Sequence, residues 1–169
     1  MAFMLRTVTT NLMSRDGFVW PMLGPVECPD WDSNPTRDCG GGLHGLPNAE
    51  GEWGLLTRPV GHWLIVHYQP TDEVRSADKT RIRRGRVESV TVADLWTRLA
   101  ELRGHNQWSG SLYLQGTGIT TLPDGLHVGG YLDLQGTGIT TLPDGLHVGG
   151  SLDLQGTGIT TLPDGLHVG

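Results

Sequence analysis

The sequence has 169 residues, of which 37% are hydrophobic and 18% charged, and its formal net charge is −6 at pH 7. This composition favours a folded chain over a disordered one, and the acidic balance gives no overall attraction to nucleic acid or to an anionic membrane. The N-terminus lacks the apolar core of a secretory signal and no apolar run is long enough to span a membrane, so we expect a cytoplasmic protein.

The chain changes character near residue 105. Upstream there is no internal similarity, whereas from residue 111 a 20-residue unit occurs three times with almost no change. We therefore predict an α+β domain over residues 1–105, followed by a short β-rich repeat solenoid over residues 106–169.

The first part contains three predicted strands and a long loop region. A short strand over 17–21 ends at a proline, and the segment 25–54 carries turn-forming residues at almost every third place, so we expect it to be an ordered loop. The run over 62–70 has the β-branched content of a buried strand. The run over 79–90 alternates as a second long strand.

A helix is predicted over residues 92–103. Thr91 and Asp94 form a capping signature at its start, apolar side chains recur at helical spacing, and Gly104 is a natural stop. We expect its apolar stripe to pack on the sheet and to brace the first repeat.

The segment 39–53, CGGGLHGLPNAEGEW, is the sharpest candidate site in the first part. Consecutive glycines allow a sharp bend or a close approach of the backbone to a ligand, and the absence of a following GK[ST] excludes a nucleotide P-loop. The candidate pocket residues are Gly41, Gly42, His44 and Glu50.

A glycine, a hydrophobic residue and a histidine ahead of a strand are similar to the core of ADP-ribosyltransferases. The resemblance implies that His44 forms the wall holding a nicotinamide and that Glu50, Glu52 or Glu88 polarises the ribose. The alternative is a loop histidine satisfied by backbone hydrogen bonds, so whether the chain is an enzyme stays open.

A second resemblance covers roughly residues 15–90. The stretch GFVWP…PDWD…CGGGLHGL, followed by HWLIV and the basic RIRRGRV, resembles an uncharacterised domain of actinobacterial and phage or prophage proteins. It implies a mobile-element context and no particular activity.

Cysteines and basic residues suggest two further sites. Cys28 and Cys39 are best interpreted as free thiols, with a disulfide, or a zinc site shared with His44 and either His62 or His67, as alternatives. Their spacing is not that of a zinc knuckle, so we predict no metal and no cofactor.

The basic run over 79–86 is either a solvated strand edge or a contact for an anionic partner. The candidates for that contact are Arg81, Arg83, Arg84 and Arg86.

Each repeat places Leu132 and Leu134, or their counterparts, on one side of a strand, then an isoleucine, and then a return through Leu-Pro. This spacing resembles the short 20-residue leucine-rich repeats of bacterial effector proteins over residues 111–169. Thr117 stands where that family has an asparagine that ties neighbouring turns, and Gly129 replaces its first leucine, so a flatter β-helix-like coil is the alternative.

Stacked repeats align equivalent residues in columns. The leucine column containing Leu132 and the isoleucine column containing Ile139 are predicted to be core. The histidine column of His127, His147 and His167 invites a metal hypothesis, but duplication alone produces such a column. The positions that vary among repeats face away from the core and are the predicted binding residues: Tyr113, Tyr131, Asp133 and Asp153.

These features together predict a noncatalytic protein-interaction or assembly module, associated with a phage or prophage and acting on a protein partner. The alternative is an enzyme or nucleotide-binding domain centred on residues 40–44, with the repeats as a targeting module. The last repeat has no polar cap after it, so we also expect an end-to-end dimer or larger assembly through this coil, with a chain truncated at Gly169 as the alternative.

Overall fold

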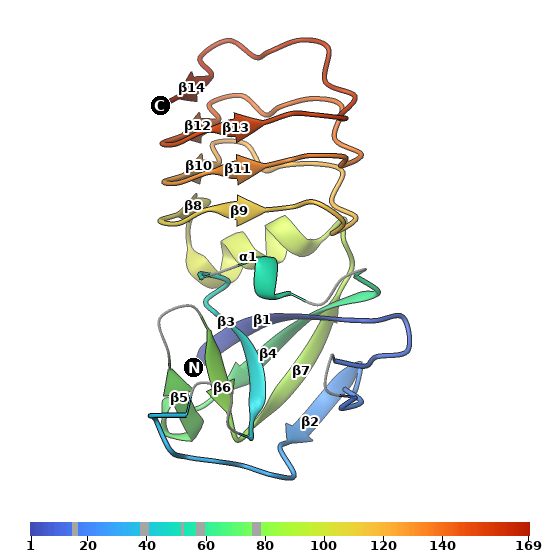
Figure 1. Ribbon diagram of the computed structural model, residues 1–169, viewed down its shortest axis with the longest axis vertical. Helices are drawn as coiled ribbons and strands as arrows, with labels where there is room; N and C mark the ends of the chain where they lie inside the picture. The colour runs from blue at the N-terminus through green and yellow to red at the C-terminus, as the bar shows by residue number, and fades with distance from the viewer. Residues whose placement is uncertain (15–16, 38–40, 52, 57–59, 76–78) are drawn as a thin grey trace. The chain divides into compact units, whose positions relative to one another are not determined.

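The computed structural model describes the chain except for residues 15–16, 38–40, 52, 57–59 and 76–78. The chain forms two compact units, Met1–Val90 and Thr91–Gly169 (Figure 1). The sequence predicts the boundary near residue 105, whereas the second unit already begins before the helix.

The first unit is built on an antiparallel sheet with the strand order β2-β7-β4-β1-β3-β6-β5. Its strands are β1 (Ala2–Val8), β2 (Leu23–Glu27), β3 (Leu43–Pro47), β4 (His62–Tyr68), β5 (Glu73–Arg75), β6 (Thr80–Ile82) and β7 (Arg84–Val90). Two single-turn 3₁₀ helices, η1 (Trp53–Leu55) and η2 (Pro70–Asp72), flank β4.

One face of this sheet forms an apolar core. Met4 of β1, Val66 of β4 and Val87 of β7 are cross-strand partners in one row, and each is at most 1% exposed. Cross-strand partners point to the same face, so this row and its neighbours bury a continuous apolar surface. On the other face, Trp53 of η1 lies against Trp63 of β4, with ring centres 5.9 Å apart.

The α+β prediction is wrong for this unit, because its described residues form strands and 3₁₀ turns but no α-helix. The strand predicted over 17–21 is only an isolated bridge between Met13 and Val19. The predicted loop region 25–54 contains β3, which lies between β1 and β6. The strand predicted over 62–70 is confirmed as β4, and the run over 79–90 forms two strands rather than one, separated by Arg83.

The predicted helix is confirmed as α1 (Leu95–Arg103), which belongs to the second unit. The hydroxyl of Thr91 accepts a hydrogen bond from the Asp94 N–H at 3.2 Å, as the capping signature indicates. Gly104 adopts φ 76° and its N–H donates to the Ala100 carbonyl at 2.7 Å, ending the helix.

The repeats form stacked coils over residues 111–130, 131–150 and 151–169, each of which adds one two-residue strand to each of two parallel sheets (Figure 1). One sheet has the order β14-β12-β10-β8 and the other β13-β11-β9. The strands are β8 (Gln107–Trp108), β9 (Leu112–Tyr113), β10 (His127–Val128), β11 (Leu132–Asp133), β12 (His147–Val148), β13 (Leu152–Asp153) and β14 (His167–Val168). The leucine-rich-repeat prediction is wrong, because the segment interpreted as a return carries a second strand that pairs from coil to coil.

Two departures from the leucine-rich pattern have physical reasons here. The Thr117 hydroxyl donates to the Leu114 carbonyl of its own coil at 2.5 Å, so it closes a turn instead of tying neighbouring coils. A Cβ on Gly129 would lie 2.4 Å from the Ser109 carbonyl oxygen, and Gly149 meets the Gly129 oxygen in the same way at 2.5 Å. Only glycine permits this close approach of successive coils.

Helix α1 packs against the first coil. The Trp96 indole N–H donates to the Thr121 carbonyl at 2.7 Å, and its ring meets Trp108 edge-on with centres 5.5 Å apart. The Arg103 guanidinium lies over the Trp108 ring at 4.4 Å. The first coil is therefore covered on its N-terminal side, as the sequence predicts for a bracing helix.

Candidate functional site

The predicted pocket residues Gly42 and His44 line a cavity of about 310 Å³ in the first unit. They lie at the start of β3, where His44 is the cross-strand partner of Arg81 in β6. Arg6 donates through Nη1 to the His44 carbonyl at 3.1 Å and places its guanidinium 5.6 Å from the ring centre of Trp20, which also lines the cavity. His44 is thus a strand residue in the wall of a real cavity.

The consecutive glycines are explained by packing. A Cβ on Gly41 would lie 1.7 Å from the Asp30 carbonyl oxygen, and a Cβ on Gly42 would lie 2.9 Å from the Cβ of Arg81. Both positions exclude a side chain because backbone or buried side-chain atoms already occupy that space. A bound ligand is not needed to account for them.

The acids proposed for an ADP-ribosyltransferase-like site do not gather at this cavity. Glu50 is half-buried after β3 and is not among the cavity's lining residues, and Glu88 accepts from or pairs with His67 at 3.0 Å. Glu52 lies outside the described residues. The carboxylate in the cavity wall is the exposed Asp30, to which the Cys28 thiol donates at 3.0 Å.

The zinc and disulfide hypotheses depend on Cys39, which lies outside the described residues. Cys28 is buried. Within the part of the chain that the structure describes, no three histidine, cysteine or acidic side chains converge on a position that could hold a metal ion.

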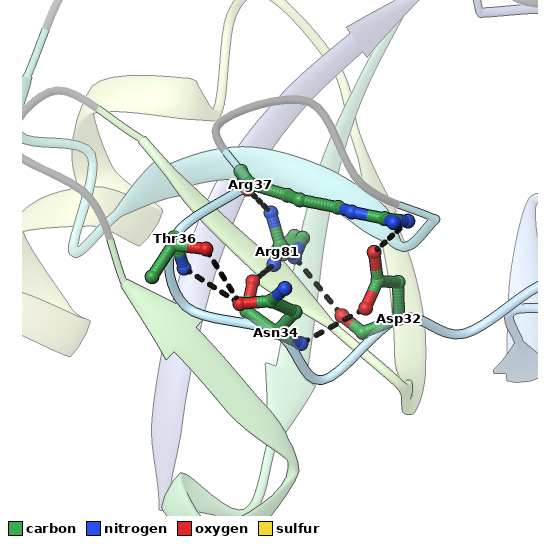
Figure 2. Close-up of polar contacts among 5 residues, drawn as sticks. All are labelled: Asp32, Asn34, Thr36, Arg37 and Arg81. Atoms are coloured by element: carbon green, nitrogen blue, oxygen red, sulfur yellow. Dashed lines mark hydrogen bonds and ion pairs between the residues drawn. The ribbon is translucent and has the colours of Figure 1, made fainter.

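Arg81 lies at the centre of the best-defined polar cluster of the first unit (Figure 2). It is 3% exposed, and its guanidinium donates to the carbonyls of Asp32, Asn34 and Arg37. One fork of donors therefore binds three points of the 32–37 loop. The alternating pattern of side chains along β6 does not predict that Arg81 binds this loop, because the acceptors are backbone atoms about forty-five residues earlier in the chain.

The same loop is held by its own side chains. The Asn34 N–H donates to Asp32 Oδ1 at 2.9 Å, and Arg37 pairs with Asp32 Oδ2 at 3.2 Å (Figure 2). The backbone hydrogen bond from Asn34, with smaller help from the Arg37 charge, lowers the pKa of Asp32. Asn34 Oδ1 accepts from the Thr36 N–H at 3.0 Å, completing a chain of short turns.

Glu73 forms a second polar cluster that the sequence does not reveal. Its Oε1 accepts from the Tyr68 hydroxyl at 2.8 Å, the Thr80 hydroxyl at 2.7 Å and Arg75 Nε at 3.0 Å. Burial acts to raise the pKa of Glu73, but the hydrogen bonds outweigh it and the pKa is lowered. Burial, then the bond to Glu73, raises the pKa of Tyr68 to about 12. These three partners tie β4, β5 and β6 together.

The four arginines predicted to contact an anionic partner do not form one surface. Arg81 is buried in its loop cluster, whereas the other three are exposed. Arg83 lies 3.7 Å from Glu27, and Arg84 lies 3.1 Å from Asp72. Arg86 forms no ion pair with any residue that the structure describes. Three of the four candidate charges are therefore already engaged within the unit.

The predicted binding residues of the repeats do lie together, on the outward side of the β9-β11-β13 sheet. The rings of Tyr113 and Tyr131 have centres 5.8 Å apart, and the Tyr131 hydroxyl donates to Asp153 Oδ2 at 3.1 Å. Asp133 is the cross-strand partner of both Tyr113 and Asp153, and all four side chains are half-buried. Partial burial, followed by the hydrogen bond to Asp153, raises the pKa of Tyr131. We call these four residues the tyrosine face.

The histidine column lies on the other sheet, in β10, β12 and β14. The rings of His127 and His147 stack with centres 4.2 Å apart, and those of His147 and His167 with centres 4.3 Å apart. Nearly parallel rings direct their nitrogen lone pairs alongside one another rather than toward a shared point, which disfavours a common metal ion. Desolvation, followed by the charges of its two neighbours, lowers the pKa of His147.

The repeats also expose a band of threonines. Both threonines of each Ile-Thr-Thr segment are exposed, which gives two columns along the stack: Thr120, Thr140 and Thr160, and Thr121, Thr141 and Thr161. Adjacent coils are about 4.8 Å apart where their strands pair. This surface is polar, uncharged and regular, and repeat-by-repeat variation does not interrupt it.

Comparison with known proteins gives one partial similarity. An ice nucleation protein from Xanthomonas campestris pv. translucens is 29% identical over 80 residues. These residues make up 47% of this chain and 5% of that relative, so the chain spans a very small part of its length. No family model and no solved structure matches the chain. The described part of the chain contains no helix with the length and apolar character needed to cross a membrane.

Proposed function

We propose that this chain is a noncatalytic protein-interaction or assembly module in which the tyrosine face of the repeats binds a protein partner. The observation that carries the proposal is that the variable positions of otherwise identical coils form one continuous surface. Tyrosine supplies contact area with little loss of side-chain entropy, which makes it common at the centres of interfaces. The resemblance of residues 15–90 to phage and prophage domains is the reason for proposing a mobile-element setting.

The chemistry of the tyrosine face selects the partner. Asp133 and Asp153 place two carboxylates beside the two rings, and no basic side chain belongs to this face. A complementary surface carries lysine or arginine next to an apolar or aromatic group, because guanidinium and ammonium groups both pair with carboxylates and stack on aromatic rings.

The test is a pull-down from the native host with the full chain as bait. The double variant Tyr113→Ala and Tyr131→Ala should lose partners that the wild type retains at moderate salt. The matched control is Thr121→Ala with Thr141→Ala, which removes two exposed side chains from the same coils but outside the tyrosine face. Equal recovery of every partner by both double variants contradicts the proposal.

A second candidate function is binding to ice or to ordered water, which the similarity to an ice nucleation protein and the threonine columns support. Hydroxyl groups repeated at a constant interval on a flat surface can hold a regular layer of water. Replacing Thr140 and Thr141 by lysine places charge in the middle of that array. Droplet-freezing temperature and the growth of ice crystals in the presence of the protein, compared between wild type and this variant, test it; identical freezing behaviour of wild type and buffer excludes it.

Self-association through the last coil is the assembly part of the proposal. Leu162 and Val168 are 61% and 42% exposed, whereas their counterparts Leu142 and Val148 in the preceding coil are 7% and 0% exposed. The N-terminal side of the first coil is covered by α1, so self-association would pair two last coils and close as a dimer. A monomer mass by light scattering at high protein concentration contradicts this part.

A further inference from the structure

The first unit contains a second cavity, of about 540 Å³, at the β2, β7 and β4 end of its sheet. It is larger than the cavity at His44 and shares no lining residue with it. Its volume lies within the range of roughly 300–1,000 Å³ that is usual for small-molecule sites. None of the residues predicted from the glycine-rich segment belongs to it.

The sheet register builds one wall of this cavity. Arg86 in β7 is the cross-strand partner of Pro25 in the edge strand β2 and of His67 in β4, and all three residues line the cavity. Cross-strand partners share a face, so a cation lies in the middle of this row, with a proline on one side and an imidazole on the other. Proline is tolerated here because β2 is at the edge of the sheet.

Among the described residues, the charged side chains that line the cavity are paired with one exception, and the α-ammonium of Met1 is a further cation in the lining. Arg84 lies 3.1 Å from Asp72, and His67 Nε2 lies 3.0 Å from Glu88 Oε2. Glu27, the remaining acid in the lining, is 3.7 Å from Arg83. Arg86 is exposed and forms no ion pair within the described residues. The cavity therefore presents one uncompensated guanidinium among charges that largely neutralise one another.

The rest of the lining includes apolar surface. Pro25 of β2 lies on the same face as Arg86, whereas Val26 and Tyr68 belong to the buried core on the other face, and the Tyr68 hydroxyl donates to Glu73. Ligand sites typically combine an apolar lining with a few placed polar groups. A guanidinium forms two parallel hydrogen bonds to a carboxylate, which gives both affinity and orientation.

We propose that this cavity binds a small organic carboxylate, with the carboxylate on Arg86 and the hydrocarbon part against Pro25. The site is independent of the tyrosine face and of the repeats. It also accounts for the basic run over 79–86: of its exposed arginines, Arg86 is the one without an ion pair among the residues that the structure describes, while Arg83 and Arg84 have acids beside them.

The experiment uses the full chain and octanoate as the probe, with octanol as a neutral probe of the same chain length. Saturation-transfer NMR should detect octanoate binding in the millimolar range or tighter. Arg86→Gln should weaken octanoate binding about tenfold, because it removes a charge-assisted pair, and should leave octanol binding unchanged. Arg86→Lys keeps the charge but loses the planar fork, and should bind octanoate with intermediate affinity.

The matched control is Arg83→Gln, which removes the same charge from a neighbouring exposed position that does not line the cavity. It should bind octanoate as the wild type does. Three results overturn the proposal: no saturable octanoate binding by the wild type, equal binding by wild type and Arg86→Gln, or an equal loss in Arg83→Gln and Arg86→Gln. Because Arg86 is exposed, circular dichroism should show the variant to be folded; if it is not, Arg86→Lys against Arg83→Lys decides the question with both charges retained.

Discussion

Replacing Arg81 by methionine should destabilise the first unit by about 2–4 kcal/mol. The guanidinium donates to three loop carbonyls, and a hydrogen bond to a charged group contributes roughly 1.5–3 kcal/mol. The total is smaller than the sum of three bonds, because Asn34 and Arg37 are exposed and their carbonyls regain water. Methionine retains the apolar stem of the side chain, so the loss reports the donors rather than a cavity.

Two measurements test the effect of Arg81→Met. Urea unfolding gives the difference in the free energy of unfolding, and hydrogen exchange followed by mass spectrometry reports the amides of residues 31–37 directly. Arg81→Met should speed exchange in this segment more than elsewhere in the sheet. The control is Arg84→Met, which removes a 60% exposed arginine paired with Asp72 and should cost less than about 1 kcal/mol. The reasoning is refuted if the two variants are equally stable and exchange in 31–37 is unchanged.

Three further predictions concern the repeats. Leu132→Ala, at a fully buried position, should cost about 2–5 kcal/mol, and the equivalent change at the half-buried Leu152 clearly less; equal losses in urea unfolding would mean that the last coil is covered. Gly129→Ala should destabilise the stack by about 1–3 kcal/mol, because the added Cβ would lie 2.4 Å from a carbonyl oxygen. Gly110→Ala is the control, since a Cβ there meets open space and should be tolerated. If thermal melts show Gly110→Ala to be as destabilising as Gly129→Ala, the packing argument is contradicted. The pKa of His147 is lowered in the folded state, so on acidification the unfolded chain binds this proton first. The contribution of His147 to the free energy of unfolding is therefore present above pH 6.5 and lost as the pH falls below it. His147→Gln should make the free energy of unfolding depend less on pH between about pH 7.5 and 5, and an unchanged dependence would count against the stacked column as its source.

The interior of the repeats could be predicted from sequence because it depends on a strict period. Leu112 and Leu132 are fully buried and Ile119 is 1% exposed, as their columns predict. The second strand of each coil could not be found in this way. Two residues, such as His127 and Val128, are too few to show an alternating pattern, and their extended conformation is stabilised by pairing with identical residues in the next coil.

The first unit was harder to predict for a different reason. Strand β3 lies in a glycine- and proline-rich segment, and it is a strand because β1 and β6 supply partners on both sides. Local propensity reads Gly45 as a turn residue, whereas its missing side chain makes room for Met4, whose sulfur would lie 2.8 Å from an added Cβ. Tertiary packing overrides the local signal here.

Some of the candidate sites could be predicted from the sequence and others could not. The tyrosine face could be predicted because position within a repeat fixes the direction of each side chain. Arg81 and Arg86 could not be told apart, since both lie in one basic run, on strands β6 and β7 that are consecutive in the sequence but separated in the sheet by β4, β1 and β3. One is enclosed by a loop from a distant part of the chain, and the other is left exposed beside a cavity. Only the three-dimensional pairing of distant segments separates a structural arginine from one available to a ligand.

Because the coils have nearly identical sequences, they can pair with one another in the wrong order during folding. The coils 131–150 and 151–169 offer nearly the same strands to the first coil, and docking the third in place of the second doubles the length of the loop to be closed. That doubling costs only about 0.6 kcal/mol, a weak preference for the correct neighbour. The two ends of the stack are what differ: Trp108 occupies in β8 the place that Val128 holds in β10, and α1 adjoins only that end. We therefore expect folding of the array to start at Trp108 and proceed one coil at a time, with a skipped coil as its characteristic error.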